Sequence, residues 1–336
     1  MTSPIQPTIP GLHHVTAITA DPQKNIDFYT GVLGMRLVKL TVNFDDPGSY
    51  HLYYGDELGH PGTIMTFFAW PGAYRGKIGP PQVTTTGFAV PAGAVDYWAA
   101  RLKEHNVPAQ APVERFGERA IHCTDPDGLV LEIVAVAGPE GTPWPGGSIP
   151  EEHAIRGFHS VTISEEGYES TAGLLTDVMG FVAAGNDGNR FRYRAGGAGH
   201  AGGGASGAGA GAGQRGSGFA SIVDLLCVPD ARRGDMGAGV VHHVAFRTHD
   251  DAQQLAWRER IVQLGLNVSP VMDRSYFHSI YYREPGGVLF EIATENPGFT
   301  VDEPAERLGS SLKLPPPLER HRTEIERFVP PLRLPS

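Results

Sequence analysis

The sequence is poor in cysteine: Cys123 and Cys227 are the only two in 336 residues. Each lies in a segment predicted to be a strand. Two thiols cannot form a disulfide framework or a thiolate metal cluster. Any metal must therefore bind to nitrogen and oxygen, and the 14 histidines supply the nitrogen.

Long apolar runs and basic blocks are also missing. No apolar segment approaches the roughly 20 residues that span a bilayer, and the N-terminal MTSPIQPTIP does not have the regions of a signal peptide. The net charge is -10, without a basic cluster that would grip phosphates. We therefore expect a cytoplasmic protein that binds neither membranes nor nucleic acids; a homo-oligomer is compatible with these features.

Internal repetition is the most informative feature of the sequence. Four segments share the order strand, helix, several strands, and they begin with LHHVTAIT after Gly11, TTTGFAV at Thr84, GFHSVTI at Gly157 and VVHHVAF at Val240. A βαβββ unit exposes one face of a curled sheet, and a second unit can cover that face. The sequence therefore predicts an α+β fold in which four βαβββ modules form two cupped half-barrels.

Helix signals support the modules. Asp21 and Pro22 form an N-cap and a first helical residue, and Gly34 is a stop signal. Apolar residues at helical spacing mark the buried faces of the helices in the first, second and fourth modules: Ile26, Tyr29 and Leu33; Val95, Trp98 and Leu102; Leu255, Ile261 and Leu264.

The Pro/Gly-rich segment GPEGTPWPGGSIPEEH suggests a domain boundary near residue 150. We predict domains at residues 8–150 and 151–315, with two modules each, and a C-terminal tail at 316–336. Residues 195–218 are almost entirely Gly and Ala, which predicts a disordered loop. The Gly202-x-Gly204-x-x-Gly207 pattern inside it lacks the βαβ context of a phosphate-binding loop.

Alignment of the modules reveals repeated polar positions. Their last strands place four residues in one column: Thr66, Glu132, Asp224 and Glu291. Their first strands align three histidines: His14, His159 and His243. A carboxylate inside an apolar strand such as VLFEIAT must be paired or must coordinate a cation. Glu291 is therefore expected either to bind a metal or to form a salt bridge with an arginine.

Two imidazoles and one carboxylate form the facial set of ligands that non-haem Fe(II) enzymes use, with open positions for substrate and oxygen. The fourth module supplies His243 and Glu291. The third ligand is His14 or His159, and spacing alone leaves this choice open.

The chain resembles ring-cleaving dioxygenases of the hydroquinone type, including the chlorohydroquinone 1,2-dioxygenases, within the vicinal oxygen chelate superfamily of glyoxalases, bleomycin-resistance proteins and extradiol dioxygenases. The resemblance extends from about residue 11 to about residue 315 and rests on six motifs: GLHHVTAIT, IDFYTGVLGMRLVK, YHLYYGDELGHPGTIMT, RGFHSVT, VVHHVAF and YYREPGGVLFEIATENPGFT.

This resemblance implies that the first and fourth modules form the metal-bearing cup, with His14, His243 and Glu291 as ligands. His159 and Glu132 would then lie in the other cup, which lacks a complete ligand set. The pattern of ordinary catechol extradiol enzymes would instead pair His159 with His243.

The resemblance also implies Fe(II), or alternatively Mn(II), as cofactor and a small aromatic compound with O2 as substrates. The matching site residues are His13, Thr16, His242, Arg274 and Tyr281. Strand alternation supports Thr16 on the face of His14 and argues against His13 and His242 as direct ligands, because adjacent residues point apart. We expect Tyr281 with His242 or His13 to transfer protons and Arg274 to stabilise negative charge, while packing or support of the ligands is the alternative for the two histidines.

Two other functions fit the same fold. One is a glyoxalase-like lyase or epimerase that uses Zn(II), Ni(II) or Co(II) without oxygen. The other is a metal-free resistance protein whose cups bind aromatic compounds or drugs. Oxygen uptake separates the first from a dioxygenase, and metal content separates the second.

Overall fold

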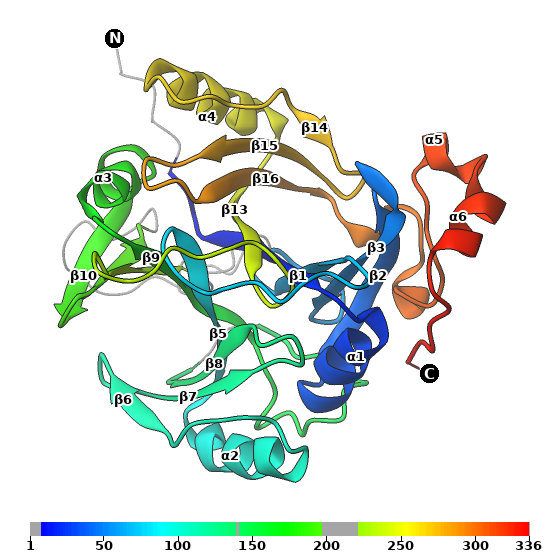
Figure 1. Ribbon diagram of the computed structural model, residues 1–336, viewed down its shortest axis with the longest axis horizontal. Helices are drawn as coiled ribbons and strands as arrows, with labels where there is room; N and C mark the ends of the chain where they lie inside the picture. The colour runs from blue at the N-terminus through cyan, green and yellow to red at the C-terminus, as the bar shows by residue number, and fades with distance from the viewer. Residues whose placement is uncertain (1–7, 139–140, 197–220, 336) are drawn as a thin grey trace, which may run out of the picture.

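Two curled eight-stranded sheets form the body of the protein in the computed structural model (Figure 1), which describes residues 8–138, 141–196 and 221–335. Each of the four predicted modules consists of a strand, a helix and three further strands. The α+β fold with two half-barrels is therefore confirmed. Most of the Gly/Ala-rich segment predicted to be a disordered loop, together with its Gly-x-Gly-x-x-Gly pattern, lies outside the described residues.

The first two modules occupy the N-terminal part of the chain. The elements of the first are β1 (Leu12–Thr19), α1 (Pro22–Ile26), the π-helical segment η1 (Asp27–Val32), β2 (Arg36–Asn43), β3 (Asp46–Gly55) and β4 (Ile64–Ala69). Those of the second are β5 (Gln82–Pro91), η2 (Ala92–Ala94), α2 (Val95–Glu104), β6 (Val113–Arg115), β7 (Glu118–Thr124) and β8 (Val130–Val136).

The remaining modules repeat this order. The third comprises β9 (Gly157–Glu165), α3 (Glu169–Gly173), the π-helical segment η3 (Leu174–Val178), β10 (Phe181–Asp187), β11 (Arg190–Ala195) and β12 (Ile222–Cys227). The fourth comprises β13 (Val241–Thr248), α4 (Asp251–Gln263), β14 (Met272–Asp273), β15 (Phe277–Arg283) and β16 (Leu289–Pro297). Short helices follow: η4 (Phe299–Val301), η5 (Ala305–Arg307), α5 (Pro316–Glu319) and α6 (Arg322–Phe328).

Each sheet combines modules from both halves of the chain. The first has the strand order β14-β15-β16-β13-β1-β4-β3-β2, so it contains the first and fourth modules. The second has the order β10-β11-β12-β9-β5-β8-β7-β6, so it contains the second and third. The antiparallel pairs β1–β13 and β5–β9 join the modules within a sheet. The division into domains at residue 150 stays a prediction, because each sheet takes strands from both sides of that point.

Strand register confirms the predicted column on the last strands. In each module the column residue pairs with a residue of the first strand, namely Thr16, Gly87, Thr162 and Ala245. Two residues before these positions lie His14 in the first module and His243 in the fourth, but Ser160 in the third. His159 therefore matches His13 and His242, and its alignment with the other two ligand candidates is wrong by one residue.

The helices begin and bury their faces largely as predicted. Asp21 caps α1 by accepting hydrogen bonds from two backbone N–H groups, with Pro22 as the first helical residue. Gly34 ends this segment at a φ of 69°, where a Cβ would lie 2.4 Å from the side chain of Ile149. Both the backbone conformation and the close approach require glycine here.

The predicted buried face of α4 is partly wrong. Leu255 and Leu264 are 51% and 49% exposed, whereas Gln254, Trp257 and Ile261 face the sheet. The amide of Gln254 donates hydrogen bonds to the backbone oxygens of residues 278 and 292. A polar side chain therefore occupies a core position because it satisfies carbonyl groups of β15 and β16, which Figure 1 shows beside α4.

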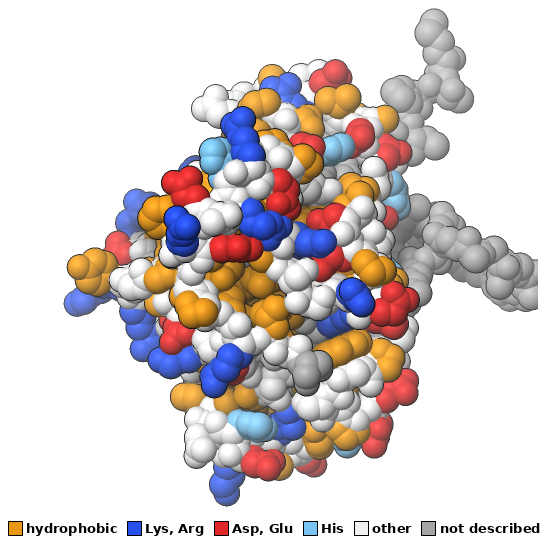
Figure 2. All heavy atoms as spheres, turned by 90° about the vertical axis from the view of Figure 1, so that its right-hand side faces the viewer, with side chains coloured by type: hydrophobic (Ala, Val, Ile, Leu, Met, Phe, Trp, Pro, Cys, Tyr) orange, Lys and Arg blue, Asp and Glu red, His pale blue; other side chains and the backbone are white. Residues whose placement is uncertain are grey.

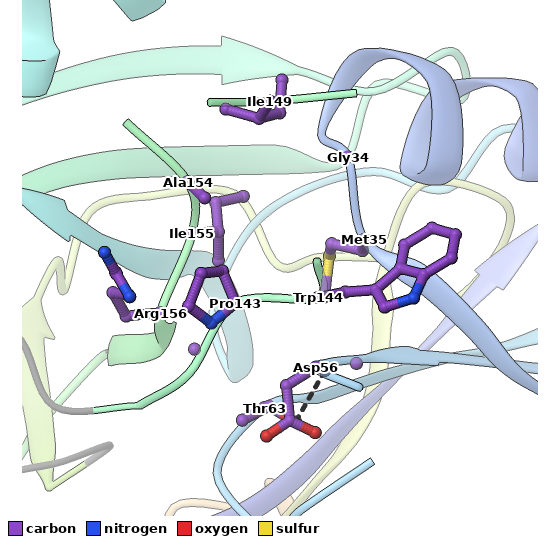
Figure 3. A pocket seen from close by; sticks show the side chains of 12 residues that line it. Gly34, Met35, Asp56, Thr63, Pro143, Trp144, Ile149, Ala154, Ile155 and Arg156 are labelled. Carbon is purple, nitrogen blue, oxygen red and sulfur yellow. Dashed lines mark hydrogen bonds between the residues drawn. The ribbon is translucent and has the colours of Figure 1, made fainter. Parts of the chain in front are cut away.

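The crossover between the second and third modules packs against the first (Figure 3). Trp144 lies against the guanidinium of Arg36, and Gly34 approaches Ile149 at this seam. The cavity there has a volume of about 20 Å³. That space holds about one water molecule, so this seam is a packed joint and not a substrate site.

The C-terminal segment is fastened to the first module by a buried cation. Lys39 on β2 is fully buried; its ammonium donates to Asp302, Glu303 and the carbonyl oxygen of Phe299, and lies 4.9 Å from the ring centre of Tyr276. The segment then continues into α5 and α6 beside β2 and β3 (Figure 1). The ion pairs of Lys39 therefore hold the C-terminal segment at the rim of the half-barrel that the first and fourth modules form, which we call the first cup.

Figure 2 shows the mixed character of one face of the molecule. Acidic and basic side chains are interspersed there, with apolar patches between them. Within the described part of the chain, none of the helices combines the length and apolar character needed to cross a bilayer.

The buried ion pairs of Lys39 generate a test of the fold. Replacing Lys39 with Met leaves Glu303 buried without its cation, and we expect the free energy of unfolding to fall by about 3–5 kcal/mol. Urea denaturation measures this change. The control is Lys77→Met, which removes an exposed pair with Asp235 and should leave the denaturation midpoint unchanged. Equal effects of the two substitutions would contradict the structural role of Lys39.

Candidate active site

Three side chains from adjacent strands converge inside the first cup. His14 on β1, His243 on β13 and Glu291 on β16 are all buried. Glu291 Oε2 lies 3.2 Å from His14 Nε2 and 2.9 Å from His243 Nε2, and the two nitrogens are 3.4 Å apart. These atoms form a group whose spacing could hold one metal ion. The structure thus brings His14, and not His159, to Glu291.

The tautomer of His14 follows from its neighbours. His13 Nε2 lies 3.0 Å from the carbonyl oxygen of Thr294, which can only accept, so this nitrogen carries a proton. Burial lowers the pKa of His13 to about 3, so the ring is neutral and its Nδ1 is an acceptor. His14 Nδ1 lies 2.9 Å from that atom and must donate. In the neutral form of His14, the lone pair of Nε2 then faces Glu291.

His242 supports the second ligand in the same way. Its Nδ1 lies 2.8 Å from His243 Nδ1, and burial lowers the pKa of His242 to about 3. If His243 donates from Nδ1, its Nε2 presents a lone pair to Glu291, and His242 keeps a proton on Nε2. Residues that hold the outer nitrogen of a ligating histidine fix its ring orientation and tautomer. His13 and His242 therefore suit support of the ligands, as strand alternation suggested.

Electrostatics at Glu291 test whether the residues fit a cation. Its Oε1 accepts a hydrogen bond from Ser279, while no hydrogen-bond donor among the described residues satisfies Oε2. Burial opposes its charge, and positive charge or N–H groups on His14 and His243 would hold the pKa of Glu291 well below its ordinary value. When both imidazoles instead turn lone pairs toward the carboxylate, as ligands do, a metal cation takes that part. Three lone-pair atoms thus face one another in a buried space. Such an arrangement is unfavourable without a cation, and the donor set fits a divalent metal.

Comparisons with known proteins agree with this geometry. Residues 11–133 and 157–292 match the model of the Glyoxalase/Bleomycin resistance protein/Dioxygenase superfamily. The chain belongs to this superfamily.

Relatives within the superfamily match nearly the full length of the chain. "Putative ring-cleaving dioxygenase MhqO" of Bacillus subtilis is 47% identical over 96% of this chain and 97% of its own length. "Chlorohydroquinone/hydroquinone 1,2-dioxygenase" of Sphingobium indicum is 36% identical over 96% of each chain. The crystal structure of a "putative dioxygenase" from Bacillus subtilis superposes with a TM-score of 0.88 at 46% identity, covering 98% of this chain and 99% of that one. The resemblance in the sequence motifs is therefore confirmed.

A cavity of about 320 Å³ is lined by two of the three candidate ligands, His14 and His243. This volume falls at the lower end of ordinary small-molecule pockets. Its apolar lining includes four large side chains: Phe68, Trp70, Phe277 and Leu289. Such a lining favours a flat aromatic molecule and restricts water.

Arg274 and Tyr281 form a polar wall that the fourth module contributes to the cavity. Arg274 Nε donates to the hydroxyl of Tyr281 at 3.2 Å, and Arg274 Nη1 donates to Asp45 Oδ2 at 3.1 Å. Although burial opposes its charge, Tyr281 and Asp45 raise the pKa of Arg274. The guanidinium is therefore a fixed cation held between β15 and the turn after β2.

The predicted site residues divide into two groups. His242, Arg274 and Tyr281 line the cavity together with the two histidine ligand candidates. His13 and Thr16 do not line it: His13 lies behind His14, and Thr16 Oγ1 is 3.1 Å from Thr66 Oγ1.

Four polar lining residues were missed from the sequence: Asn43, Asp45, His51 and Tyr53. The signal for the last two was available in the alternation of the YHLYY segment, which places residues 51 and 53 on one face of a strand. Asn43 ends β2 and Asp45 lies in the turn that follows it, and their approach to the site depends on the curl of the sheet.

The second cup fills the equivalent positions with ion pairs. Glu132 Oε1 lies 2.8 Å from Arg115 and 2.9 Å from His122, and Asp224 contacts Arg190 and Arg192. His122 and Arg115 outweigh burial and lower the pKa of Glu132 to about 2. The salt-bridge interpretation considered for Glu291 thus describes Glu132 instead.

Removal of the carboxylate should abolish metal binding. Purified protein reconstituted anaerobically with Fe(II) should contain a single ion per chain, and Glu291→Gln should contain almost none, because the converging lone pairs lose their negative charge. Glu132→Gln, at the matching position of the second cup, should retain the metal. Elemental analysis after desalting measures both. Metal retained by Glu291→Gln, or lost from Glu132→Gln in folded protein, would contradict the assignment.

Proposed function

We propose that this protein is a ring-cleaving dioxygenase that holds Fe(II) through His14, His243 and Glu291 and inserts O2 into a hydroquinone-type aromatic compound. The observation that carries the proposal is the buried cluster of two imidazole lone pairs and one carboxylate at the end of an aromatic-lined cavity. The name and substrate of the Sphingobium indicum relative support the same reaction class.

The proposed cofactor follows from the ligand set. Fe(II) supplies the one-electron steps that let triplet oxygen react with a singlet aromatic ring. The same two-histidine, one-carboxylate set also suits Mn(II), which is the alternative cofactor. The task of the protein is to keep both imidazoles oriented, and His13 and His242 do so through their Nδ1 contacts.

The fourth module contributes the groups that handle charge and protons. Arg274 remains a cation beside Tyr281 and can stabilise negative charge that develops on a substrate oxygen. Because Arg274 Nε donates to the oxygen of Tyr281, the hydroxyl hydrogen of Tyr281 is available to the cavity. His242 lines the same cavity, and the two residues are our candidates for proton transfer.

The alternative functions fit the site less well. A lyase or epimerase of this fold would use more carboxylate, yet the metal-ligating group found among the described residues contains Glu291 as its only acid. A metal-free module that sequesters aromatic compounds would leave the converging lone pairs of the cluster without a cation. The single carboxylate and the converging lone pairs each favour an oxygenase over the corresponding alternative.

Oxygen consumption tests the reaction class directly. Protein loaded anaerobically with Fe(II) should consume O2 on addition of hydroquinone, chlorohydroquinone or methylhydroquinone, and should use catechol less well. An oxygen electrode measures uptake, and mass spectrometry should find the opened ring with both oxygen atoms. Metal-loaded protein without oxygen uptake on any of these compounds would exclude the dioxygenase.

The proposed role of Tyr281 gives a second test. Tyr281→Phe removes a hydroxyl from the cavity and should lower kcat by about 100-fold or more, the scale of general acid–base catalysis. Metal content should not change, because Tyr281 is outside the ligand set. Tyr282→Phe is the matched control, since its hydroxyl points to Met179 on the opposite face of β15. Unchanged turnover by Tyr281→Phe would remove it from the mechanism.

A further inference from the structure

His51 is one of the polar residues of the cavity whose role the proposed reaction does not explain. It lies on β3, lines the cavity, and packs against the rings of Tyr53 and Phe68 at centroid distances of 4.1 and 4.5 Å. The first module thus places an imidazole in the wall that faces the Arg274 and Tyr281 side of the curled sheet.

The four modules show why this histidine differs from its counterparts. On the third strand of each module, one residue pairs in register with the column of the last strand: Tyr53, His122, Arg192 and Tyr281. Two residues earlier lie His51, Ala120, Arg190 and Ser279.

Where this earlier residue is polar, it bonds to the column. Arg190 contacts Asp224, and Ser279 contacts Glu291. His51 Nε2 reaches the column in the first module, but there it meets the hydroxyl of Thr66, at 2.7 Å. A histidine that faces a carboxylate would be held as part of an ion pair, and His51 has no such partner in the part of the chain that the structure describes.

Both nitrogens of His51 bond to neutral hydroxyl groups. Thr66 Oγ1 lies on one side and continues to Thr16, and Tyr53 OH lies 2.9 Å from Nδ1 on the other. A neutral imidazole offers one donor and one acceptor, and hydroxyl groups can take either part. The Tyr53 hydroxyl, which also belongs to a lining residue, can therefore present either a hydrogen or a lone pair to the cavity, according to the His51 tautomer.

We propose that His51 and Tyr53 form a subsite that binds the ring hydroxyl of the substrate that is not directed to the metal. The proposal rests on the proposed function, which requires an aromatic compound with two hydroxyl groups on opposite sides of the ring. A buried second hydroxyl without a hydrogen-bond partner would be costly. The first module supplies a neutral pair that can serve it whether it donates or accepts, while Arg274 already holds Asp45 and Tyr281.

Paired ligands test the subsite without turnover. Hydroquinone and phenol differ only in the second hydroxyl, and their binding to anaerobic Fe(II)-loaded protein can be measured by titration calorimetry. Tyr53→Phe and His51→Leu should each weaken hydroquinone binding by about three- to tenfold, the scale of one neutral hydrogen bond. Phenol binding should change by less than about twofold.

Further variants separate the subsite from packing. The double variant should lose little more than either single one, because the two residues act as a unit. His51→Asn places an amide near the Nδ1 position and should recover part of the hydroquinone affinity that His51→Leu loses. Tyr50→Phe is the matched control on the same strand; its hydroxyl donates to the Pro330 carbonyl on the opposite face, and both ligands should bind unchanged.

The outcomes distinguish this proposal from the proposed function. Equal losses of hydroquinone and phenol binding, or unchanged hydroquinone binding in Tyr53→Phe, would overturn the subsite even if the wild-type protein consumes oxygen. If Tyr53→Phe weakens hydroquinone binding but the wild-type protein consumes no oxygen, the dioxygenase proposal is overturned and the subsite stands.

Discussion

The antiparallel pairing of β1 with β13 is the contact on which the candidate site depends. It places Thr16 opposite His243 and joins the first and fourth modules. The Nε2 atoms of His14 and His243, which are 229 positions apart in the chain, therefore lie 3.4 Å from each other. Glu291 enters the same space because β16 runs parallel to β13, with Ala245 opposite Glu291. A slip of one residue would turn these side chains to the other face of the sheet. The site is therefore a property of register between distant segments.

The support of this register is distributed over the whole molecule. The buried ammonium of Lys39 fixes the C-terminal segment at the rim of the first cup, and Asp45 meets Arg274 where the two ends of the curled sheet approach each other. The crossover through Trp144 fills the seam beside α1. These contacts lie away from the ligands, yet they hold the modules whose relative placement sets the distances between the ligands.

Local chemistry made much of this structure predictable from the sequence. The Asp21 cap, the Gly34 stop and the repeated modules follow from short-range rules, and the carboxylate column followed from alternation within strands. The exposed Leu255 and Leu264 did not, because the choice of a helix face depends on tertiary packing. The offset of His159 was readable from the sequence, since aligning GLHHVT with GFHSVT pairs His159 with His13, as the strand register does. His51 escaped notice for another reason: its neighbour in the column is a threonine, so no charge pattern in the sequence marks it.

Comparison of the two cups shows what makes one carboxylate a metal ligand and another a structural residue. Glu132 and Asp224 sit beside Arg115, Arg190 and Arg192, whose charges neutralise them inside the protein. A cation brought to such a carboxylate would meet the arginines first, and the site has no net negative charge to offer. Glu291 instead has a serine hydroxyl on one oxygen and two imidazole lone pairs near the other. No arginine among the described residues pairs with Glu291. Because burial makes an uncompensated carboxylate costly, this leaves a demand for a metal that the arginines of the second cup remove.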